Sequence, residues 1–407
     1  RRRLENFRAN RRGFWSLWIF LVLFVLTLFA EFIANDKPIL ARVDDRWLFP
    51  VLVGYAESDV LPDGLPVTMD WHDPELREEF VDRGGWAVWP PIRYKHDSVV
   101  RDLGRPSPAP PSARNLLGTD DQSRDVLARV IYGFRISVLF GFTLTIVSSI
   151  IGIAAGAVQG YYGGWVDLGF QRFIEVWSGM PQLYLLIILS AIIQPTFWTL
   201  LVFLLLFSWM SLTGVVRAEF LRGRNFDYVR AAKAMGVSDA AVMRRHILPN
   251  AMVATLTFLP FILSTSVTVL ASLDFLGFGL PPGSPSLGEL VSQGKNNLQA
   301  PWLGITAFVV LGALLTLLIF VGEAQVLTPM GAIPLAFELE ATTLAEAIAK
   351  FGDAAQVAVE RTARELREMR REQASSIVVP GSGMGGMGGL GGGGLGGLGG
   401  GGKIQMP

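Results

Sequence analysis

Five long apolar runs constrain the fold of this chain more than any other feature of its sequence. They cover residues 14–34, 136–158, 198–216, 251–273 and 302–321. A helix needs about twenty apolar residues to cross the roughly 30 Å hydrocarbon core of a bilayer. In lipid, only helices and closed barrels satisfy every backbone hydrogen bond. We therefore predict an all-α polytopic membrane protein.

A sixth crossing is predicted between the second and third of these runs. The clean apolar segment 180–193 is short, and it needs the preceding turns, which contain Arg172 and Glu175, to span the bilayer. Proline bends membrane helices because it lacks an N–H group. We expect one spanning helix that bends near Pro181, with Arg172 and Glu175 as a local pair near its cytoplasmic end.

The composition agrees with hydrocarbon as the solvent for much of the chain. Of 407 residues, 51% are hydrophobic and 17% are charged, and the mean hydropathy is +0.41. Ordinary soluble domains are about 25% charged, so a plain cytosolic enzyme is excluded. The 35 basic and 35 acidic side chains cancel, which leaves no overall field to attract nucleic acid. The absence of cysteine excludes disulfides and thiolate sites.

The distribution of basic residues predicts the topology. The chain begins with a basic segment that should hold this end in the cytoplasm. A cleaved signal peptide is the alternative, but the apolar run is longer than the usual 7–15 residues. Six spans then place residues 217–250, with 7 basic side chains, in the cytoplasm and residues 274–301 outside. The prediction is a multi-pass membrane protein with both termini cytoplasmic.

A polar, tryptophan-containing segment at 36–129 follows the first span and is predicted to be extracytoplasmic. Its proline-rich part at 105–114 is typical of an extended linker. Aromatic residues are favoured at interfaces, so this insertion could help to dock a partner. A small core, or anchoring at the membrane surface, explains the same residues equally well. Its tryptophan and tyrosine residues are Trp47, Tyr55, Trp71, Trp86, Trp89 and Tyr94.

The cytoplasmic segment 217–250 has the pattern of a helical hairpin. Tyr228, Ala231, Ala232 and Met235 recur at helical spacing and are expected to share one face. Glycine then stops the first helix, and a second helix over 240–247 is expected to end at a proline. Small residues let another backbone approach closely. A docking role is one interpretation, and a plain connector with topogenic arginines is the other.

The same segment resembles the EAA loop of ABC importer permeases. That loop has an acidic-Ala-Ala triplet, a glycine after three more residues, and a closing Ile-Leu-Pro. Arg230 stands at the acidic position, as is common in the dipeptide and oligopeptide (DppC/OppC) branch. The residues that fit are Ala231, Ala232, Gly236, Ile247, Leu248 and Pro249.

Two further motifs support that branch. The segment LLGTDDQSRDVLARVIYGFRISVLFG at 116–141 is similar to its GTDxxGRDVLSRLIYG pattern, with Ser123 in place of a glycine. This substitution matters only if the turn needs a positive φ. SLDFLGFGLPPGSPSLGELV at 272–291 resembles the branch's outer loop between the last two spans. The insertion at 36–129 resembles that of the YejE-type permeases, which take part in peptide and microcin import.

The resemblance implies a location in the bacterial inner membrane, and it also implies the partners of this chain. It implies a second permease of similar fold, a cytoplasmic ABC ATPase, an extracytoplasmic substrate-binding protein and a peptide substrate in a lipid membrane. The chain contains no G-x-x-x-x-G-K-[ST] motif. We therefore expect ATP and magnesium on the partner ATPase and no cofactor on this chain.

The resemblance also implies an ATPase-coupling site on the hairpin. Ala231, Ala232 and Gly236 are expected to form the close-packed contact, with charges at its rim, and Pro249 to fix the start of the fifth span. The full set is Asp227, Tyr228, Arg230, Ala231, Ala232, Lys233, Met235, Gly236, Val237, Ile247, Leu248 and Pro249.

Other functions have less support. A secondary transporter or channel needs no ATPase and should show broken helices with buried charges near the midplane. A membrane-anchored scaffold with a ligand-binding outer domain is another alternative. The 3 histidines are scattered and no H-E-x-x-H or G-x-S-x-G motif occurs, so we predict no catalytic or metal site.

The predicted organisation has five parts and a tail that the family does not explain. Residues 343–373 have the spacing of an amphipathic helix, and 16 of the 45 glycines fall between residues 381 and 402. A soluble helix is the expectation for this region, with a regulatory domain or a fused segment as alternatives. The parts are 1–35, the basic N-terminus and first span; 36–129, the insertion; 130–324, a five-helix core with the coupling loop 217–250; 325–375, a cytoplasmic helical extension; and 376–407, a disordered glycine-rich tail.

Overall fold

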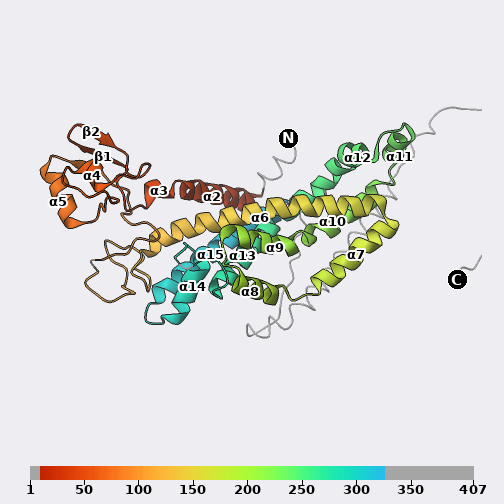
Figure 1. Ribbon diagram of the computed structural model, residues 1–407. Coiled ribbons are helices and arrows are strands. Elements are labelled where there is room, and N and C mark those ends of the chain that lie inside the picture. The colour runs from red at the N-terminus through yellow and green to blue at the C-terminus, as the bar shows by residue number, and fades with distance from the viewer. Residues whose placement is uncertain (1–9, 102, 282, 326–407) are drawn as a thin grey trace, which may run out of the picture. The chain divides into compact units, whose positions relative to one another are not determined.

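The computed structural model describes residues 10–101, 103–281 and 283–325. All of them belong to the first of the chain's two units, Arg1–Met330. The predicted helical extension and glycine-rich tail lie outside the described residues. Within this part of the chain, five helical segments are long and apolar enough to cross a membrane, and a bent pair raises the number to six. Figure 1 shows the long helix α6 running through the middle of the group.

Among the described residues, four of the five spanning segments contain their predicted runs and extend beyond them. The first segment, α2, ends at Leu28, before the end of its predicted run at residue 34. The helix α6 begins at Val126, well before its apolar run, because Asp125 caps it by accepting a hydrogen bond from the Ala128 N–H at 2.8 Å. The segments are α2 (Arg11–Leu28), continued by the short α3 (Ala30–Ile33); α6 (Val126–Tyr162); α9 with α10 (Phe197–Ser208, Met210–Gly223); α12, η1 and α13 (Asp239–Val242, Met243–Ile247, Leu248–Phe275); and α15 (Pro301–Gln325).

The predicted bent span is a pair of helices. The helices α7 (Gly164–Ser178) and α8 (Gln182–Ile192) meet at an angle of 70°. The break contains Pro181, as predicted, and proline disfavours a helical conformation at the residue before it. Arg172 and Glu175 form the expected local pair, with nitrogen and oxygen 2.5 Å apart on the exposed side of α7.

The second helix of the hairpin does not end at Pro249, contrary to the prediction. A π-helical turn, η1, joins α12 to α13, and Pro249 lies in the first turn of α13. In η1 the Leu248 N–H reaches back to the Met243 carbonyl, one residue further than in an α-helix. Pro249 has no N–H to donate, so the wider turn lets the helix continue. The hairpin is thus continuous with the span at 248–275.

A stripe of glycines brings α6 close to α10. A Cβ on Gly152, Gly156 or Gly160 would lie 2.5 or 2.6 Å from a carbonyl oxygen of the facing helix. Small residues at every fourth position permit this kind of close helix packing in membranes. The stripe fixes α10, which leads directly into the hairpin.

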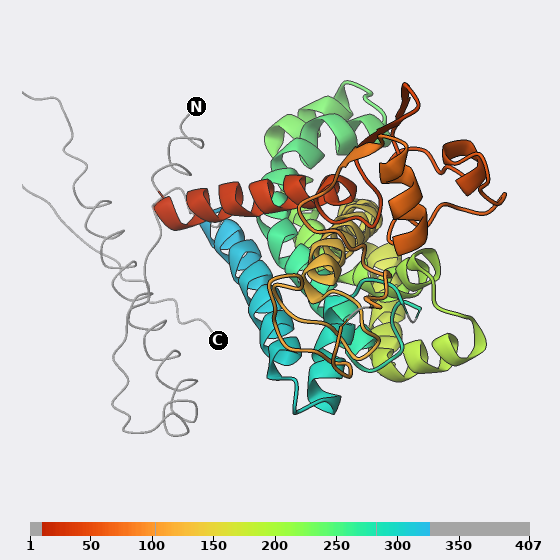
Figure 2. The same ribbon diagram turned by 90° about the vertical axis from the view of Figure 1, so that its left-hand side faces the viewer.

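The insertion contains β-structure, which the all-α prediction missed. Its strands form an antiparallel sheet in the order β2-β1-β3, with α4 (Glu57–Val60) and α5 (Pro74–Asp82) packed beside it. These elements form one cluster beyond the end of α3 (Figures 1 and 2). Ile92 ties the cluster to that helix, since its N–H donates to Ile33 and its carbonyl accepts from Asn35. The strands are β1 (Leu40–Val43), β2 (Arg46–Leu48) and β3 (Trp86–Val88).

A buried ion network joins the first turn of α6 and the segment before it to the short helix α14 (Leu287–Asn296). Arg129 is fully buried and lies 2.7 Å from Glu289, while Arg124 lies 2.7 Å from the equally buried Asp120. Ser123, within the same turn, has a φ of +63°, so the position where the family has glycine does need the left-handed conformation.

Candidate functional site

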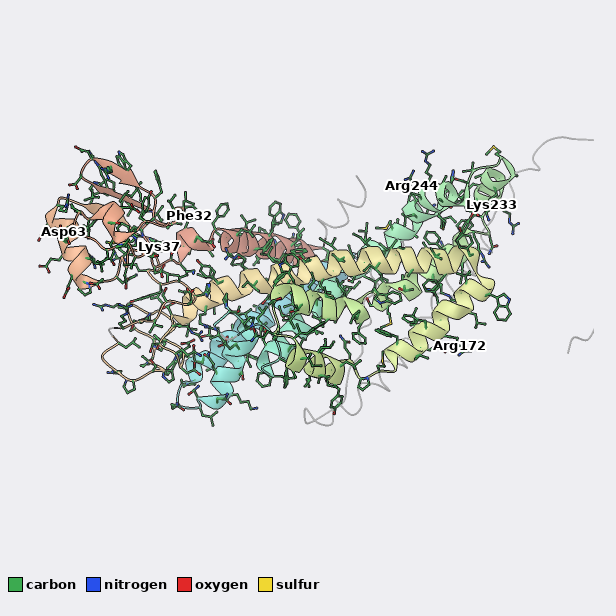
Figure 3. The ribbon with its side chains drawn as sticks, in the orientation of Figure 1. Phe32, Lys37, Asp63, Arg172, Lys233 and Arg244 are labelled. Carbon is green, nitrogen blue, oxygen red and sulfur yellow. The ribbon has the colours of Figure 1, made fainter. Side chains whose placement is uncertain are left out.

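The hairpin at residues 217–250 contains all the predicted coupling residues, of which Leu248 and Pro249 lie in the first turn of α13. Its first helix, α11, covers Asp227–Ala234. Figure 3 shows Lys233 and Arg244 of the hairpin at the right of the view, and Lys37 and Asp63 of the insertion at the left.

Gly236 ends α11 in the way that the sequence indicates. Its φ is +81°, its N–H donates to the Lys233 carbonyl, and the next N–H, of Val237, donates to the Ala232 carbonyl. This pair of bonds is the usual glycine stop of a helix. A Cβ at this position would meet nothing within 4 Å. Within this chain, the glycine is therefore required by its backbone conformation and not by close packing.

The inner face of the hairpin is packed against the ends of the spanning helices. Val229, Ala232 and Ile247 are each at most 2% exposed and share a core cluster with Val216 and Phe220 of α10. Val237 and Leu248 pack partly against the same cluster. Ala232, Val237, Ile247 and Leu248 therefore fix the hairpin to its own chain.

The outer face of α11 is exposed, and it divides the predicted contact face. Ala232 is turned inward with Val229, whereas Tyr228, Ala231 and Met235 are exposed. The expectation that all four helical-spaced residues share one open face was thus wrong for Ala232. The division falls there because Val229, three residues earlier, puts its own side of the helix into the core. Other predicted residues on the exposed side are Asp227, Arg230, Lys233 and Gly236.

Lys233 has contacts within this chain that the sequence did not indicate. Its Nζ lies 4.5 Å from the centre of the Tyr161 ring, at the end of α6, and 3.7 Å from the Asp239 carboxylate. The Tyr161 hydroxyl donates a hydrogen bond to that same carboxylate. The three side chains join α6, α11 and α12. Tyr161 is far from the hairpin in sequence, so only the fold could reveal this cluster.

Two further contacts hold the hairpin. The Asn250 side chain donates to the Tyr228 hydroxyl at 3.0 Å, which joins α11 to the start of α13. The Arg224 guanidinium donates to the Gly160 and Tyr161 carbonyls at 3.4 and 3.3 Å, where α6 ends. The hairpin is therefore braced by hydrogen bonds as well as by its apolar face.

A polar stripe lies on the exposed side of α13. Thr265, Thr268 and Ser272 follow one another at helical spacing, and all are exposed. Each hydroxyl donates to the carbonyl four residues earlier, at 2.8 or 2.9 Å. Such bonds make a hydroxyl tolerable within a membrane. Among the described residues, no group of three or more His, Cys, Asp or Glu side chains could hold a metal ion.

Comparison with known proteins assigns the chain to a family. Residues 130–326 match the model of the family described as binding-protein-dependent transport system inner membrane component. The chain is 63% identical over 324 residues to the inner membrane ABC transporter permease protein YejE of Escherichia coli, covering 79% of this chain and 94% of that protein.

Two other relatives have related names. The peptidoglycan transport system permease protein YejE of Agrobacterium fabrum is 56% identical over 348 residues, 80% of this chain and 91% of that protein. The oligopeptide transport system permease protein OppC of Lactococcus lactis is 34% identical over 221 residues, 53% of this chain and 75% of that protein.

The fold and the comparisons define a multi-pass transport subunit of the inner membrane. The chain belongs to the family of inner membrane components of binding-protein-dependent transport systems. It is an ABC permease subunit and not an enzyme.

Proposed function

We propose that this permease subunit imports peptides or peptide-like solutes, and that a separate ATPase drives it through the exposed face of α11. The observation that supports the coupling site is that one face of the hairpin is buried and the other is exposed. Its inner face is anchored by Val229 and Ala232, while Tyr228, Ala231 and Met235 are left open. Peptide transport is supported by the relatives named for oligopeptide and peptidoglycan transport.

The coupling would use two connections from the hairpin into the spans. One is the continuous helix from Asp239 to Phe275, which carries any displacement of the hairpin into α13. The other is the contact of Lys233 and Asp239 with Tyr161 at the end of α6. Rigid helices that shift against one another are a common way to transmit such movements. ATP and magnesium would bind to the ATPase and not to this chain.

The translocation path would lie along the polar stripe of α13. Thr265, Thr268 and Ser272 supply hydroxyls but no charge, which suits solutes of varied sequence. Selectivity would then rest with an extracytoplasmic binding protein, as the family description implies. A second permease of similar fold would complete the path from the other side.

The proposed topology follows the positive-inside rule. The hairpin, with Arg222, Arg244 and Arg245 exposed, lies in the cytoplasm, and so do both termini. The insertion lies outside, and lipid surrounds the spans. Because α7 carries an exposed ion pair, Arg172 with Glu175, we place that side of α7 against the second permease or water and not against lipid.

The test is a mild-detergent pull-down of the tagged chain from cells that produce its whole transport system, followed by an ATP hydrolysis assay. Ala231→Trp should release the ATPase and reduce peptide uptake at least about tenfold, because the large ring covers the exposed face of α11. The matched control is Ala113→Trp, at an exposed alanine before α6. Recovery of the ATPase with Ala231→Trp at the wild-type amount would contradict the coupling site. A chain that purifies alone and still conducts solute would favour a secondary transporter or channel.

A further inference from the structure

The insertion contains a pocket that plays no part in the coupling hairpin. It lies between α5 and β3 and has a volume of about 220 Å³. Pockets for drug-sized ligands usually measure roughly 300 to 1,000 Å³. A smaller space of this kind suits one residue of a peptide better than a whole peptide.

The apolar wall of the pocket is part of the core of the insertion. Trp71 and Phe80 are 6% and 4% exposed, and their rings meet edge to face with centroids 5.6 Å apart. Met69 belongs to the same core cluster. Trp86 is more exposed and stands on β3 at the edge of the pocket. The wall is therefore a fixed aromatic surface.

Two arginines complete the pocket. Arg77 comes from α5, and Arg93 follows β3, with its guanidinium carbon 5.4 Å from the centre of the Trp89 ring. That stacking position orients a guanidinium and leaves its N–H groups free for a planar acceptor. Neither arginine forms an ion pair with any other residue that the structure describes.

The charge of the pocket is opposite to that of its surroundings. Residues 36–101 contain 13 acidic and 8 basic side chains, a net charge of −5. The lining of the pocket nevertheless includes two arginines and no carboxylate. The lining of the pocket therefore matches the chemistry of an anion that carries an apolar group.

We propose that this pocket binds the C-terminal residue of a peptide. Its carboxylate contacts Arg77 and Arg93, and its apolar side chain lies against Trp71, Phe80 and Trp86. Guanidinium and carboxylate groups form paired, charge-assisted hydrogen bonds. This inference rests on the proposed function, since it takes the ligand from the class of solute that the permease imports.

The location of the pocket suits such a role. Ile92, next to Arg93, forms backbone hydrogen bonds with Ile33 and Asn35, so the rim of the pocket is fixed to the end of the first span. A peptide held here lies beside the membrane on the side where the binding protein is proposed to deliver it.

The test uses the full-length chain in lipid nanodiscs and fluorescence anisotropy. The probe is a fluorescein-labelled alanine peptide that ends in phenylalanine, with either a free or an amidated C-terminus. The free acid should bind at least about tenfold more tightly than the amide, and the difference should shrink at high salt. Arg77→Gln and Arg93→Gln should each weaken binding of the free acid about tenfold, whereas Arg46→Gln, at an exposed arginine of the same insertion, should not.

Equal binding of the acid and the amide would overturn the proposal, and so would equal losses with the Arg46 and Arg93 variants. An acidic control peptide with a blocked C-terminus distinguishes the terminal carboxylate from side-chain carboxylates, and tight binding of that peptide also contradicts the proposal. Uptake of the same peptide by the complete transport system is measured in parallel. Uptake without binding in the pocket rejects this inference alone, whereas absence of peptide uptake rejects the proposed function.

Discussion

A glycine can be required by its backbone conformation or by close packing, and at Gly236 the sequence alone could not distinguish these two reasons. Its φ of +81° requires a residue that tolerates the left-handed region, while the open space around it shows no packing requirement within this chain. Other L-residues there cost roughly 1–2 kcal/mol, and asparagine costs less. Gly236→Asn should therefore keep most of the peptide uptake.

Gly236→Trp adds bulk on the proposed ATPase-facing side as well as backbone strain. We expect it to abolish uptake while the amount of protein inserted in the membrane, measured by immunoblot, stays the same. Undiminished uptake with Gly236→Trp would show that this position does not face the ATPase. Equal loss with the asparagine variant would instead assign the whole effect to the end of the helix.

The stability of the insertion should depend on pH through His96. Burial lowers the pKa of this imidazole below its ordinary 6.5, although Asp97 acts in the opposite direction. The ring packs against Tyr132 with centroids 4.8 Å apart. As pH falls, the unfolded chain takes up the proton first, so the stability that is fully present above about pH 6.5 is lost as pH decreases.

We expect the thermal unfolding midpoint of the purified protein to decrease between pH 7.5 and pH 5, and His96→Gln to reduce that decrease. Burial also lowers the pKa of His72, so the double variant should reduce it further. If the unfolding midpoint of the double variant, with His72→Gln and His96→Gln, decreased as much as that of the wild type, other groups would set the pH dependence.

At the scale of the elements, hydropathy predicted the spans because lipid requires a long apolar helix. Hydropathy predicted the bounds of the helices less well, because these depend on caps, ion pairs and backbone hydrogen bonds. The start of α6 depends on the Asp125 cap and a buried ion network, and the passage through Pro249 depends on a π-turn. The exposed side of α11 was predicted only in part, since helical spacing cannot show which side Val229 turns into the core.

The glycine stripe of α6 should not tolerate even a single added methyl group. A Cβ on Gly156 would lie 2.6 Å from the Thr213 carbonyl oxygen of α10. Gly156→Ala should therefore separate the two helices and destabilise the protein by about 1–3 kcal/mol, as overpacking does. Gly214→Ala is the matched control on α10, because a Cβ there meets nothing within 4 Å. Thermal unfolding in detergent measures both variants, and equal midpoints would show that the helices can move apart freely.

At the scale of the whole molecule, the insertion and the hairpin lie at different places along α6 and have separate cores. The insertion buries Val43, Leu61 and Trp71 in one cluster, and the hairpin buries Val229 and Ile247 in another. Among the residues that the structure describes, none belongs to both clusters. The binding of peptide and the attachment of the ATPase should therefore be separable by mutation.

The register of the sheet shows where the insertion can be removed. Leu40 and Val88 are partners in neighbouring antiparallel strands, so their Cα atoms lie roughly 5 Å apart and a two-residue Asn-Gly turn can join them. Replacing residues 41–87 by this turn removes Arg77 and the aromatic wall but leaves the hairpin intact. We expect loss of peptide binding in the anisotropy assay, with the ATPase recovered in the pull-down at the wild-type amount. Ala231→Trp should show the reverse pattern, and release of the ATPase by the deletion would mean that the two parts depend on each other through α6.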